Sequence, residues 1–596
     1  MPLDPVASAN IDLVSMTMLV NGAPVPDTFQ ISQVRVHKEV NRIPTARITV
    51  RDGDPSLETF AISASQTLVP GALVELSFGY HGDEVSVFSG IIVKHAIRVN
   101  NGGKSALVIS CYGQAIKMTQ GRTSGYLGKS DSAVFSQLIG AAGLAASVTA
   151  TTALHDDIVK YYATDWDFMV CRAELNGQIV IADGATVSVG PPLVDAACVL
   201  QIGYGDALRE IDAEIDARTQ LASVTCSAWD FTAQQLATGS SVEPSVNAQG
   251  NLSGPTLAAV LGLPAFPLQS SAPVEAAQLG VWANAQLLKS RLARLRGTVS
   301  FRGNAGVLPG QMVELDGLGE RFNGNAFVSS VTHTYEGGDW LTKAGFGLPM
   351  QWFSEERSDI GAPAASGLAP GVPGLQIAKV KQIDQDPDGQ TRVLVDVPVI
   401  GMTGDGIWAR LASGYATKTG GLFFIPEIGD EVVLGFLNDD PRFPVVLGSL
   451  YSSVQTPPFT PDAPNTNKAI VTKAQLKICM DDVKKQIQMS TPGGHIITMS
   501  DDQKTITIVD SNSNKVVMSS SGITLDSPAD IVVKAGGSVT LSAATSMTLK
   551  AGTDMNLQAM NVNAKASVAL AAQGRASAEF SSSAEVTVKA PMVMIN

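Results

Sequence analysis

The chain has 596 residues, of which 45% are hydrophobic and 16% are charged, and its formal net charge at pH 7 is −14. The length predicts about four domains, and the composition indicates folded domains with buried cores rather than a disordered tail. The acidic balance argues against a nucleic-acid-binding protein, which would need a concentrated basic face.

No signal of secretion or membrane insertion is present in the sequence. The first residues lack a basic segment followed by a long apolar one, and no run of about twenty apolar residues occurs later. The cysteines are odd in number, widely separated and free of any C-x-x-C spacing: Cys111, Cys171, Cys198, Cys226 and Cys479. We therefore expect reduced, mostly buried thiols in a protein that is made in the cytoplasm and is soluble there.

Residues 11–111 have the pattern of β-strands joined by turns. Apolar and polar residues alternate along most of five segments, which predicts strands with one buried face. These segments are 11–20, 29–40, 46–50, 73–79 and 87–93. Together they favour an antiparallel barrel or sandwich.

A Pro-Gly turn recurs in the sequence. Val69-Pro70-Gly71 leads through alternating apolar residues to Phe88-Ser89-Gly90, and the same order returns from Leu308-Pro309-Gly310 to Phe322-Asn323-Gly324. We therefore expect a second barrel near residue 300 that is related to the first.

The residues between these two units predict helices as well as strands. Ser130 and Asp131 are typical of a helix start, and this helix should run towards residue 142. A strand-rich piece follows from about residue 179, then a Gly, Ser and Pro-rich connection over 238–273 and a long helix over 274–296.

The first 350 or so residues resemble the hub domain of VgrG proteins and of phage tail-hub proteins of the late-control type. The segments that carry this resemblance are Gly71 to Gly90, Tyr162-Ala163-Thr164-Asp165-Trp166-Asp167-Phe168, and the second Pro-Gly unit followed by Val331-Thr332-His333. Three N-terminal segments are most similar to the spike proteins of extracellular contractile injection systems: Val40-Asn41-Arg42-Ile43-Pro44, Arg51-Asp52-Gly53-Asp54-Pro55 and Gly79-Tyr80-His81. The resemblance implies two similar barrels in each chain and a ring of three chains with pseudo-sixfold symmetry.

A second compact β unit follows a linker that is rich in Ala, Gly and Pro. Its short strands are punctuated by Pro and Gly, as in a small closed barrel. Residues 407–410, 423–432 and 444–451 resemble the OB-fold of the VgrG and phage spike family. Acidic residues outnumber basic ones around its aromatic side chains, so we expect no nucleic-acid partner.

The last part of the chain repeats a pair of apolar residues around one polar or small residue every eight positions. These pairs predict a needle core made of Ile523, Leu525, Ile531, Val533, Val539, Leu541, Met547, Leu549, Met555 and Leu557. Eight residues form one short strand and one corner, so three octads must close each turn of a β-solenoid, from one chain or from three intertwined chains. The periodicity does not choose between these two forms, but no polar cap follows Val593, which a single-chain solenoid usually requires.

Motifs for catalysis, cofactors and metals are not evident in the sequence. Only about twenty-five residues separate Tyr451 from Leu476, too few for the lysozyme domain that some phage relatives carry there. Gly128-Lys129-Ser130 lacks the first glycine of a phosphate loop, because Thr123 stands in its place. The six histidines are scattered, and the last hundred residues contain none. We expect no enzyme, no cofactor and no metal.

The predicted fold class is mainly β, with tail-hub β-barrels and a few helices, an OB-fold barrel, and a C-terminal trimeric β-helix prism. The predicted boundaries are a hub at 1–353, a linker at 354–374, the OB-fold at 375–455, a second linker at 456–477 and the needle at 478–596. The chain is expected to be assembled, after synthesis in the cytoplasm, into the baseplate of a phage-tail-like particle, with release outside the cell left open.

The resemblance implies a homotrimeric structural spike of a contractile injection system that caps the inner tube, contacts baseplate proteins and punctures a target envelope, touching the membrane only transiently. Its alternatives are a type VI secretion or phage-tail spike of the same architecture, a baseplate lysozyme, and a solitary β-solenoid adhesin. The resemblance also implies a tip partner of the PAAR-repeat type. Its predicted docking residues are Met592, Val593, Met594, Ile595 and Asn596.

Overall fold

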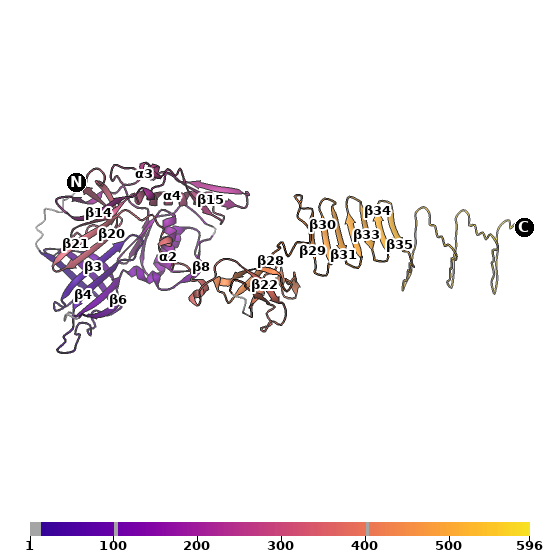
Figure 1. Ribbon diagram of the computed structural model, residues 1–596, viewed down its shortest axis with the longest axis horizontal. Coiled ribbons are helices and arrows are strands. Elements are labelled where there is room, and N and C mark those ends of the chain that lie inside the picture. Colours follow the sequence, from indigo (N-terminus) through magenta and orange to yellow (C-terminus); the bar gives the residue numbers. More distant parts are fainter. Residues whose placement is uncertain (1–12, 101–104, 156, 401–404, 596) are drawn as a thin grey trace. The chain divides into compact units, whose positions relative to one another are not determined.

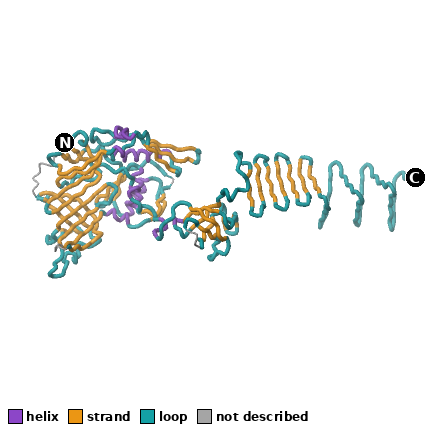
Figure 2. Tube along the Cα trace, viewed as in Figure 1, coloured by secondary structure: helices purple, strands orange, loops and turns teal. Residues whose placement is uncertain are grey.

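The computed structural model describes residues 13–100, 105–155, 157–400 and 405–595. The chain divides into two units, Met1–Leu450 and Tyr451–Asn596. Figures 1 and 2 show that strands dominate the first unit and the first part of the second. The fold is mainly β, as predicted.

The first unit is built on a 13-stranded sheet with the order β14-β18-β21-β20-β3-β4-β7-β6-β5-β1-β2, and β19 and β13 extend it beside β20. Its N-terminal strands are β1 (Val14–Val20), β2 (Ala23–Pro24), β3 (Ile31–Glu39), β4 (Thr45–Arg51), β5 (Leu73–Tyr80), β6 (Asp83–Val99) and β7 (Ser105–Tyr112). Its later strands are β13 (Cys198–Gly203), β14 (Leu208–Ile215), β18 (Leu295–Arg302), β19 (Met312–Asp316), β20 (Gly324–Glu336) and β21 (Asp339–Phe346). The predicted strand over 11–20 thus appears as β1, and residues 11 and 12 lie outside the described residues.

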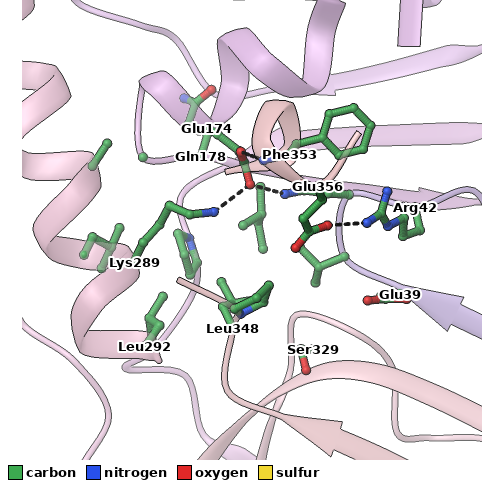
Figure 3. A pocket seen from close by; sticks show the side chains of 18 residues that line it. Glu39, Arg42, Glu174, Gln178, Lys289, Leu292, Ser329, Leu348, Phe353 and Glu356 are labelled. Carbon is green, nitrogen blue, oxygen red and sulfur yellow. Dashed lines mark hydrogen bonds and ion pairs between the residues drawn. The ribbon is translucent and has the colours of Figure 1, made fainter. Parts of the chain in front are cut away.

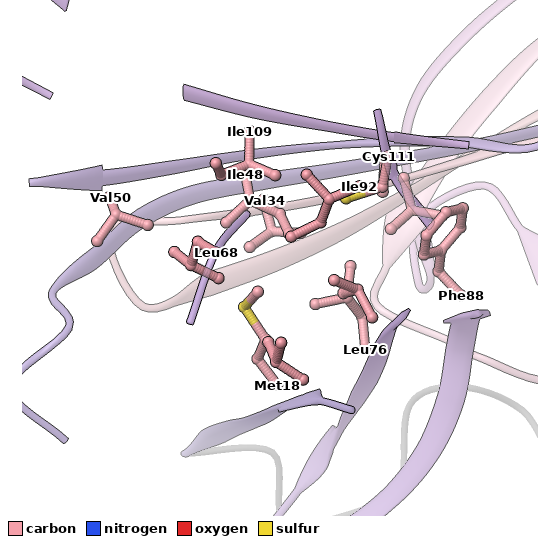
Figure 4. Packing of buried hydrophobic residues seen from close by; sticks show 14 of the residues in the cluster. Met18, Val34, Ile48, Val50, Leu68, Leu76, Phe88, Ile92, Ile109 and Cys111 are labelled. Carbon is pink, nitrogen blue, oxygen red and sulfur yellow. The ribbon is translucent and has the colours of Figure 1, made fainter. Parts of the chain in front are cut away.

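The two halves of this sheet enclose separate cores. In the N-terminal half, Val34, Ile48, Leu76, Phe88 and Ile109 are fully buried and pack together (Figure 4). The second core is formed by the later strands, with Val299, Phe301, Val313, Val328 and Phe346 among its members. Burial alternates along the strands because successive side chains point to opposite faces. The antiparallel pairing of β20 with β3 joins the predicted barrels into one continuous sheet.

Both Pro-Gly turns make the same backbone hydrogen bonds. Gly71 N–H donates to Ile92 O and Gly310 N–H donates to Val328 O, each at 2.8 Å. The amides of Ile92 and Val328 in turn donate to the carbonyls of Ala72 and Gln311, each at 2.9 Å. Both glycines have positive φ angles, 97° and 87°, which favour glycine. The internal duplication predicted from the sequence is therefore present in the hydrogen bonding.

The Phe-x-Gly motifs of the two Pro-Gly units were predicted to be equivalent, and this alignment was wrong. Because Ile92 and Val328 occupy equivalent positions, Gly90 corresponds to Ala326 and not to Gly324. The connection between β19 and β20 differs in length from the tight turn between β5 and β6, so the two Phe-x-Gly motifs lie at different registers.

A group of helices and short strands lies, in the sequence, between the two halves of the 13-stranded sheet. It comprises η2 (Gln114–Thr119), β8 (Thr123–Tyr126), α1 (Asp131–Ala141), β9 (Ala145–Val148), β10 (Val159–Ala163), α2 (Asp165–Leu175), β11 (Ile179–Asp183) and β12 (Thr186–Gly190). The predicted helix start is confirmed, because the Ser130 side chain caps α1 by accepting from the amide of Ala133.

A second group of elements replaces the predicted connection and shortens the predicted long helix. Its members are η3 (Ala217–Thr219), β15 (Val224–Asp230), β16 (Gln235–Ser240), α3 (Gly254–Leu261), β17 (Phe266–Ser270) and α4 (Ala276–Leu292). The expectation of a plain connection over 238–273 was wrong, since α3 and β17 form there. The expectation of a helix to residue 296 was also wrong, because β18 starts at Leu295 and pairs with β14 and β21. Sheet pairing overrides the helical pattern at these residues.

A short helix, α5 (Phe353–Glu356), follows β21, and the turn η4 (Ala364–Gly367) comes after it. A closed five-stranded barrel with the order β22-β23-β24-β28-β27 comes next, as predicted. Its elements are β22 (Gln376–Gln382), β23 (Val393–Asp396), β24 (Ile407–Leu411), β25 (Ala416–Thr417), β26 (Gly420–Gly421), β27 (Glu431–Phe436), η5 (Leu437–Asp439) and β28 (Pro444–Ser449). Small aliphatic side chains such as Ala378, Val395 and Val432 fill its core.

The second unit begins with a seven-stranded antiparallel sheet in which each strand pairs with the next along the chain. The strands are β29 (Asn467–Val471), β30 (Lys477–Asp481), β31 (Gln486–Ser490), β32 (Ile496–Ser500), β33 (Thr505–Val509), β34 (Lys515–Ser519) and β35 (Gly522–Asp526). Sheet structure thus begins before residue 478, the start predicted for the needle. Residues 527–595 follow as an extended coil that turns back and forth (Figure 2).

Candidate functional site: the apolar face of the needle

One face of the β29–β35 sheet is a continuous ladder of apolar side chains. The cross-strand register places Ile478 opposite Met489, and Met489 opposite Ile497. Ile497 in turn lies opposite Ile508, and Ile508 opposite Val516. A parallel row runs through Met480, Ile487, Met499, Ile506, Met518 and Ile523. Aligned rows of this kind are the stabilising contacts of a sheet.

The opposite face of the same sheet is largely polar. Gln488 lies opposite Thr498, Thr498 opposite Thr507, and Val517 opposite Thr524. The Gln488 side-chain amide also donates to the Thr498 hydroxyl at 3.4 Å. The sheet therefore has one face suited to water and one suited to a protein core.

No other described part of the chain covers the apolar face. The Ile and Met side chains of β30 to β33 on this face are 37–44% exposed. A sheet of this size with one bare apolar face is an exposed hydrophobic patch of the kind that marks a protein–protein contact.

The ten residues predicted as the needle core are also uncovered in the single chain. Ile523 and Leu525 lie on β35 at the end of the sheet, and the other eight lie in the coil beyond it. All ten are at least 50% exposed. The chain therefore places them at regular intervals without bringing them together.

The coil beyond Asp526 has no backbone ladder of its own. Throughout residues 527–595, which the structure describes, no strand forms and no backbone hydrogen bond joins one octad to the next. A strand exists only where a neighbour pairs with it, so octads with no neighbour remain extended coil. A solenoid closed within one chain is therefore not what the structure contains.

The residues predicted to dock a tip partner lie at the end of this coil. Met592, Val593, Met594 and Ile595 are 49–91% exposed, and Asn596 lies outside the described residues. Their side chains are apolar and uncovered, as are those of the octads before them.

A cavity of about 80 Å³ in the first unit surrounds a carboxylate whose donors come from three separate parts of the chain (Figure 3). Glu174 accepts from Lys289 Nζ at 2.8 Å, from Asn41 Nδ2 at 3.1 Å and from the backbone N–H of Phe353 at 2.7 Å. Arg42 lies over the ring of Phe353 and also pairs with Glu356. Because its acceptors are engaged, Glu174 fastens α5 to the hub rather than offering a free base.

Two kinds of feature are absent from the described residues, a cluster of metal ligands and a helix able to span a membrane. No three His, Cys, Asp or Glu side chains gather there as metal ligands would. No helix in the same ranges combines the length and apolar character needed to cross a bilayer. All five cysteines are free thiols. Cys111 and Cys226 are buried, whereas Cys171, Cys198 and Cys479 are half-buried, so the expectation of mostly buried thiols was wrong for three of the five.

Sequence reasoning missed the apolar face of the β29–β35 sheet. The signal was present, since apolar pairs around one residue already recur at Ile478, Ile487, Ile497 and Ile506. Their spacing of nine or ten residues differs from the octads, because each strand is followed by a hairpin turn of variable length.

Two family models match the chain. The model described as the Alg8 N-terminal domain matches residues 10–337. The model described as the type VI secretion system/phage-baseplate injector OB domain matches residues 376–451, which contain the closed five-stranded barrel.

Curated relatives match a short part of the chain. The actin cross-linking toxin VgrG1 of Vibrio cholerae is 43% identical over 53 residues, which are 9% of this chain and 5% of that protein. The type VI secretion system spike protein VgrG1a of Pseudomonas aeruginosa is 40% identical over 52 residues, 9% of this chain and 8% of that protein. The chain thus matches less than a tenth of the length of each.

Solved structures show more distant likeness. A tail protein from Neisseria meningitidis is 14% identical with a TM-score of 0.43, over 57% of this chain and 98% of that one. The Francisella PdpA–VgrG complex contains a chain that is 8% identical with a TM-score of 0.37, over 87% of this chain and 80% of that one. Likeness at this level carries no argument about function.

Proposed function

Because the chain belongs to the Alg8 N-terminal domain family and its barrel matches the injector OB domain of type VI secretion systems and phage baseplates, we propose that it is the central hub and spike of a contractile injection machine. In this role it is a structural homotrimer, assembled into the baseplate of a phage-tail-like particle. The hub caps the inner tube, and the needle leads penetration of the target envelope.

The observation that carries this proposal is the uncovered apolar face of the needle together with the unpaired octads. The apolar face needs a partner surface that covers it, and the octads need partner strands of the same length and spacing. Other copies of the same chain provide both. Three copies suit an eight-residue repeat, since each octad supplies one strand and one corner of a triangular turn. Strands from neighbouring copies would then stack about 4.8 Å apart along the axis and pair the free backbone groups.

The purified full-length chain is expected to have a native mass of about 186 kDa, three times the 62.1 kDa of one chain. Native mass spectrometry or light scattering measures it directly. The trimer should persist on dilution, because apolar burial over a long needle gives a slow dissociation rate. A chain that stays monomeric at micromolar concentration contradicts the proposal.

At the hub end, the partner is proposed to be a ring of inner-tube subunits. A sixfold tube meets a threefold hub when each chain offers two similar surfaces. The equivalent turns at Gly71 and Gly310 support this, because they give each chain two strand pairs with the same hydrogen bonding.

At the needle end, the partner is proposed to be a tip protein of the PAAR-repeat type, seated on Met592 to Ile595. Three copies of this apolar ending would meet at the axis and leave a small patch with unpaired strand edges, which suits capping by strand addition. An image of the assembled particle is expected to show tube contacts at both Pro-Gly turns and additional density beyond Ile595. Contacts at one turn per chain, or a bare end, would contradict the corresponding assignment.

A further inference from the structure

The closed barrel carries a hairpin in its third connection, between β24 and β27. This hairpin contains β25 and β26 and spans residues 413–424. The Ser413 hydroxyl donates to the carbonyl of Tyr415 at 3.1 Å and is placed 3.0 Å from that of Leu422, while the Leu422 amide donates to Tyr415 O at 2.9 Å. Local bonds therefore fix the conformation of this hairpin.

Large apolar side chains of the hairpin are left in solvent. Phe423 is 79% exposed and Phe424 is 61% exposed, and Tyr415 and Leu422 are exposed as well. The next residue, Ile425, packs against the barrel core and anchors the segment. The two phenylalanines are therefore exposed side by side, and contiguous exposed apolar groups mark protein–protein contacts.

Charge is nearly absent from the hairpin itself. In residues 413–426, Lys418 at the hairpin tip is the one charged residue. Aromatic enrichment with depletion of charge is the composition of the centre of a protein–protein interface, and buried aromatic anchors often dominate such contacts. A nucleic acid or an anionic surface would instead require basic side chains.

We propose that this hairpin packs its Phe423 and Phe424 against the barrel of a second copy of the chain. This inference rests on the proposed trimer. Only residues 450–466 separate the barrel from β29, and seventeen extended residues span at most about 60 Å. Copies joined through their needles therefore hold their barrels within reach of one another, at an effective concentration on the order of millimolar.

The contact is tested by placing a photo-crosslinking amino acid at position 423 of the full-length chain. The matched control carries it at Phe443, another exposed phenylalanine of the same barrel. Irradiation at low protein concentration is expected to give an adduct of two chains from position 423, about tenfold more than from position 443, because only the first lies in a tethered contact. Peptide mapping should place the adduct within residues 376–451 of the second copy.

The outcomes separate this inference from the proposed function. A native trimer that gives no adduct at 423, or an adduct within the same chain or to a hub or needle residue, overturns the hairpin contact and leaves the trimer standing. A monomer by native mass overturns the proposed function and this inference together. Mixing isotope-labelled with unlabelled chains before assembly distinguishes adducts between copies from adducts within one copy.

Discussion

Replacing Ile497 by Asp is expected to abolish assembly of the trimer. Ile497 lies in the middle of the apolar face, opposite Met489 on one side and Ile508 on the other. In the proposed assembly three carboxylates would be buried together without cationic partners, at a cost of several kcal/mol each. Native mass measurement of the I497D chain should show loss of the 186 kDa species.

The adjacent residue provides a matched control, because it points to the other face of the same strand. Thr498 lies between Gln488 and Thr507 on the polar face. Thr498→Asp adds the same charge to the same strand and should leave the trimer intact. If both variants lose the trimer, or both keep it, the apolar face is not the surface that joins the copies.

Acidification is expected to destabilise the hub through His333, which is fully buried on β20. Burial, and to a smaller extent the charge of Lys38, lowers the pKa of His333 from the usual 6.5 to about 3. The unfolded chain takes up a proton near pH 6.5 and the folded chain does so only near pH 3. The contribution of the neutral ring to stability is therefore fully present above pH 6.5 and is lost as the pH falls towards 3, by about 3 kcal/mol between pH 6.5 and pH 4.

The measurement is urea unfolding of the full-length chain at several pH values, followed by tryptophan fluorescence. The indole of Trp340 lies 5.9 Å from the His333 ring, measured between ring centroids. His333→Phe should flatten the decline in hub stability between pH 6.5 and pH 4. Phe78→Leu, a change in a ring that touches His333, should lower stability by a similar amount at every pH. An unchanged slope in H333F would mean that another group causes the acid sensitivity.

The helix start at Ser130 and the duplicated Pro-Gly turns were predictable, because local residues determine them. The closed barrel depends on non-local pairing, and it was predicted from its short strands punctuated by Pro and Gly and from the resemblance to the OB-fold of the spike family. The resemblance to VgrG spikes is likewise confirmed by the injector OB domain match and by the VgrG relatives. The octads could be recognised in the sequence because they have a constant length. Their strand pairing could not be predicted, since it depends on neighbouring chains that a single sequence does not specify.

The remaining differences between the predicted and the observed structure have physical causes. The pairing of β3 with β20 joins residues about three hundred positions apart. The sequence of neither strand indicates which other strand it pairs with. The end of α4 was predicted too late in the chain, because Leu295–Arg302 forms the sheet strand β18 instead of continuing the helix. The exposed Phe423 and Phe424 were read as part of a barrel, since an apolar pair beside a strand more often faces a core than solvent.

The pairing of β3 with β20 also affects how the hub can form during translation. Glu39 lies opposite Ser330, so one edge of β3 stays open until residues 324–336 have left the ribosome. At about 5–20 residues per second, synthesis of the intervening segment takes roughly 15–60 s. During this interval the nascent chain exposes a strand edge that can pair with β3 of another nascent chain on the same messenger RNA. The β3 edge is thus closed by its own chain only after most of the first unit has been synthesised, and before the strands from β29 onward are made.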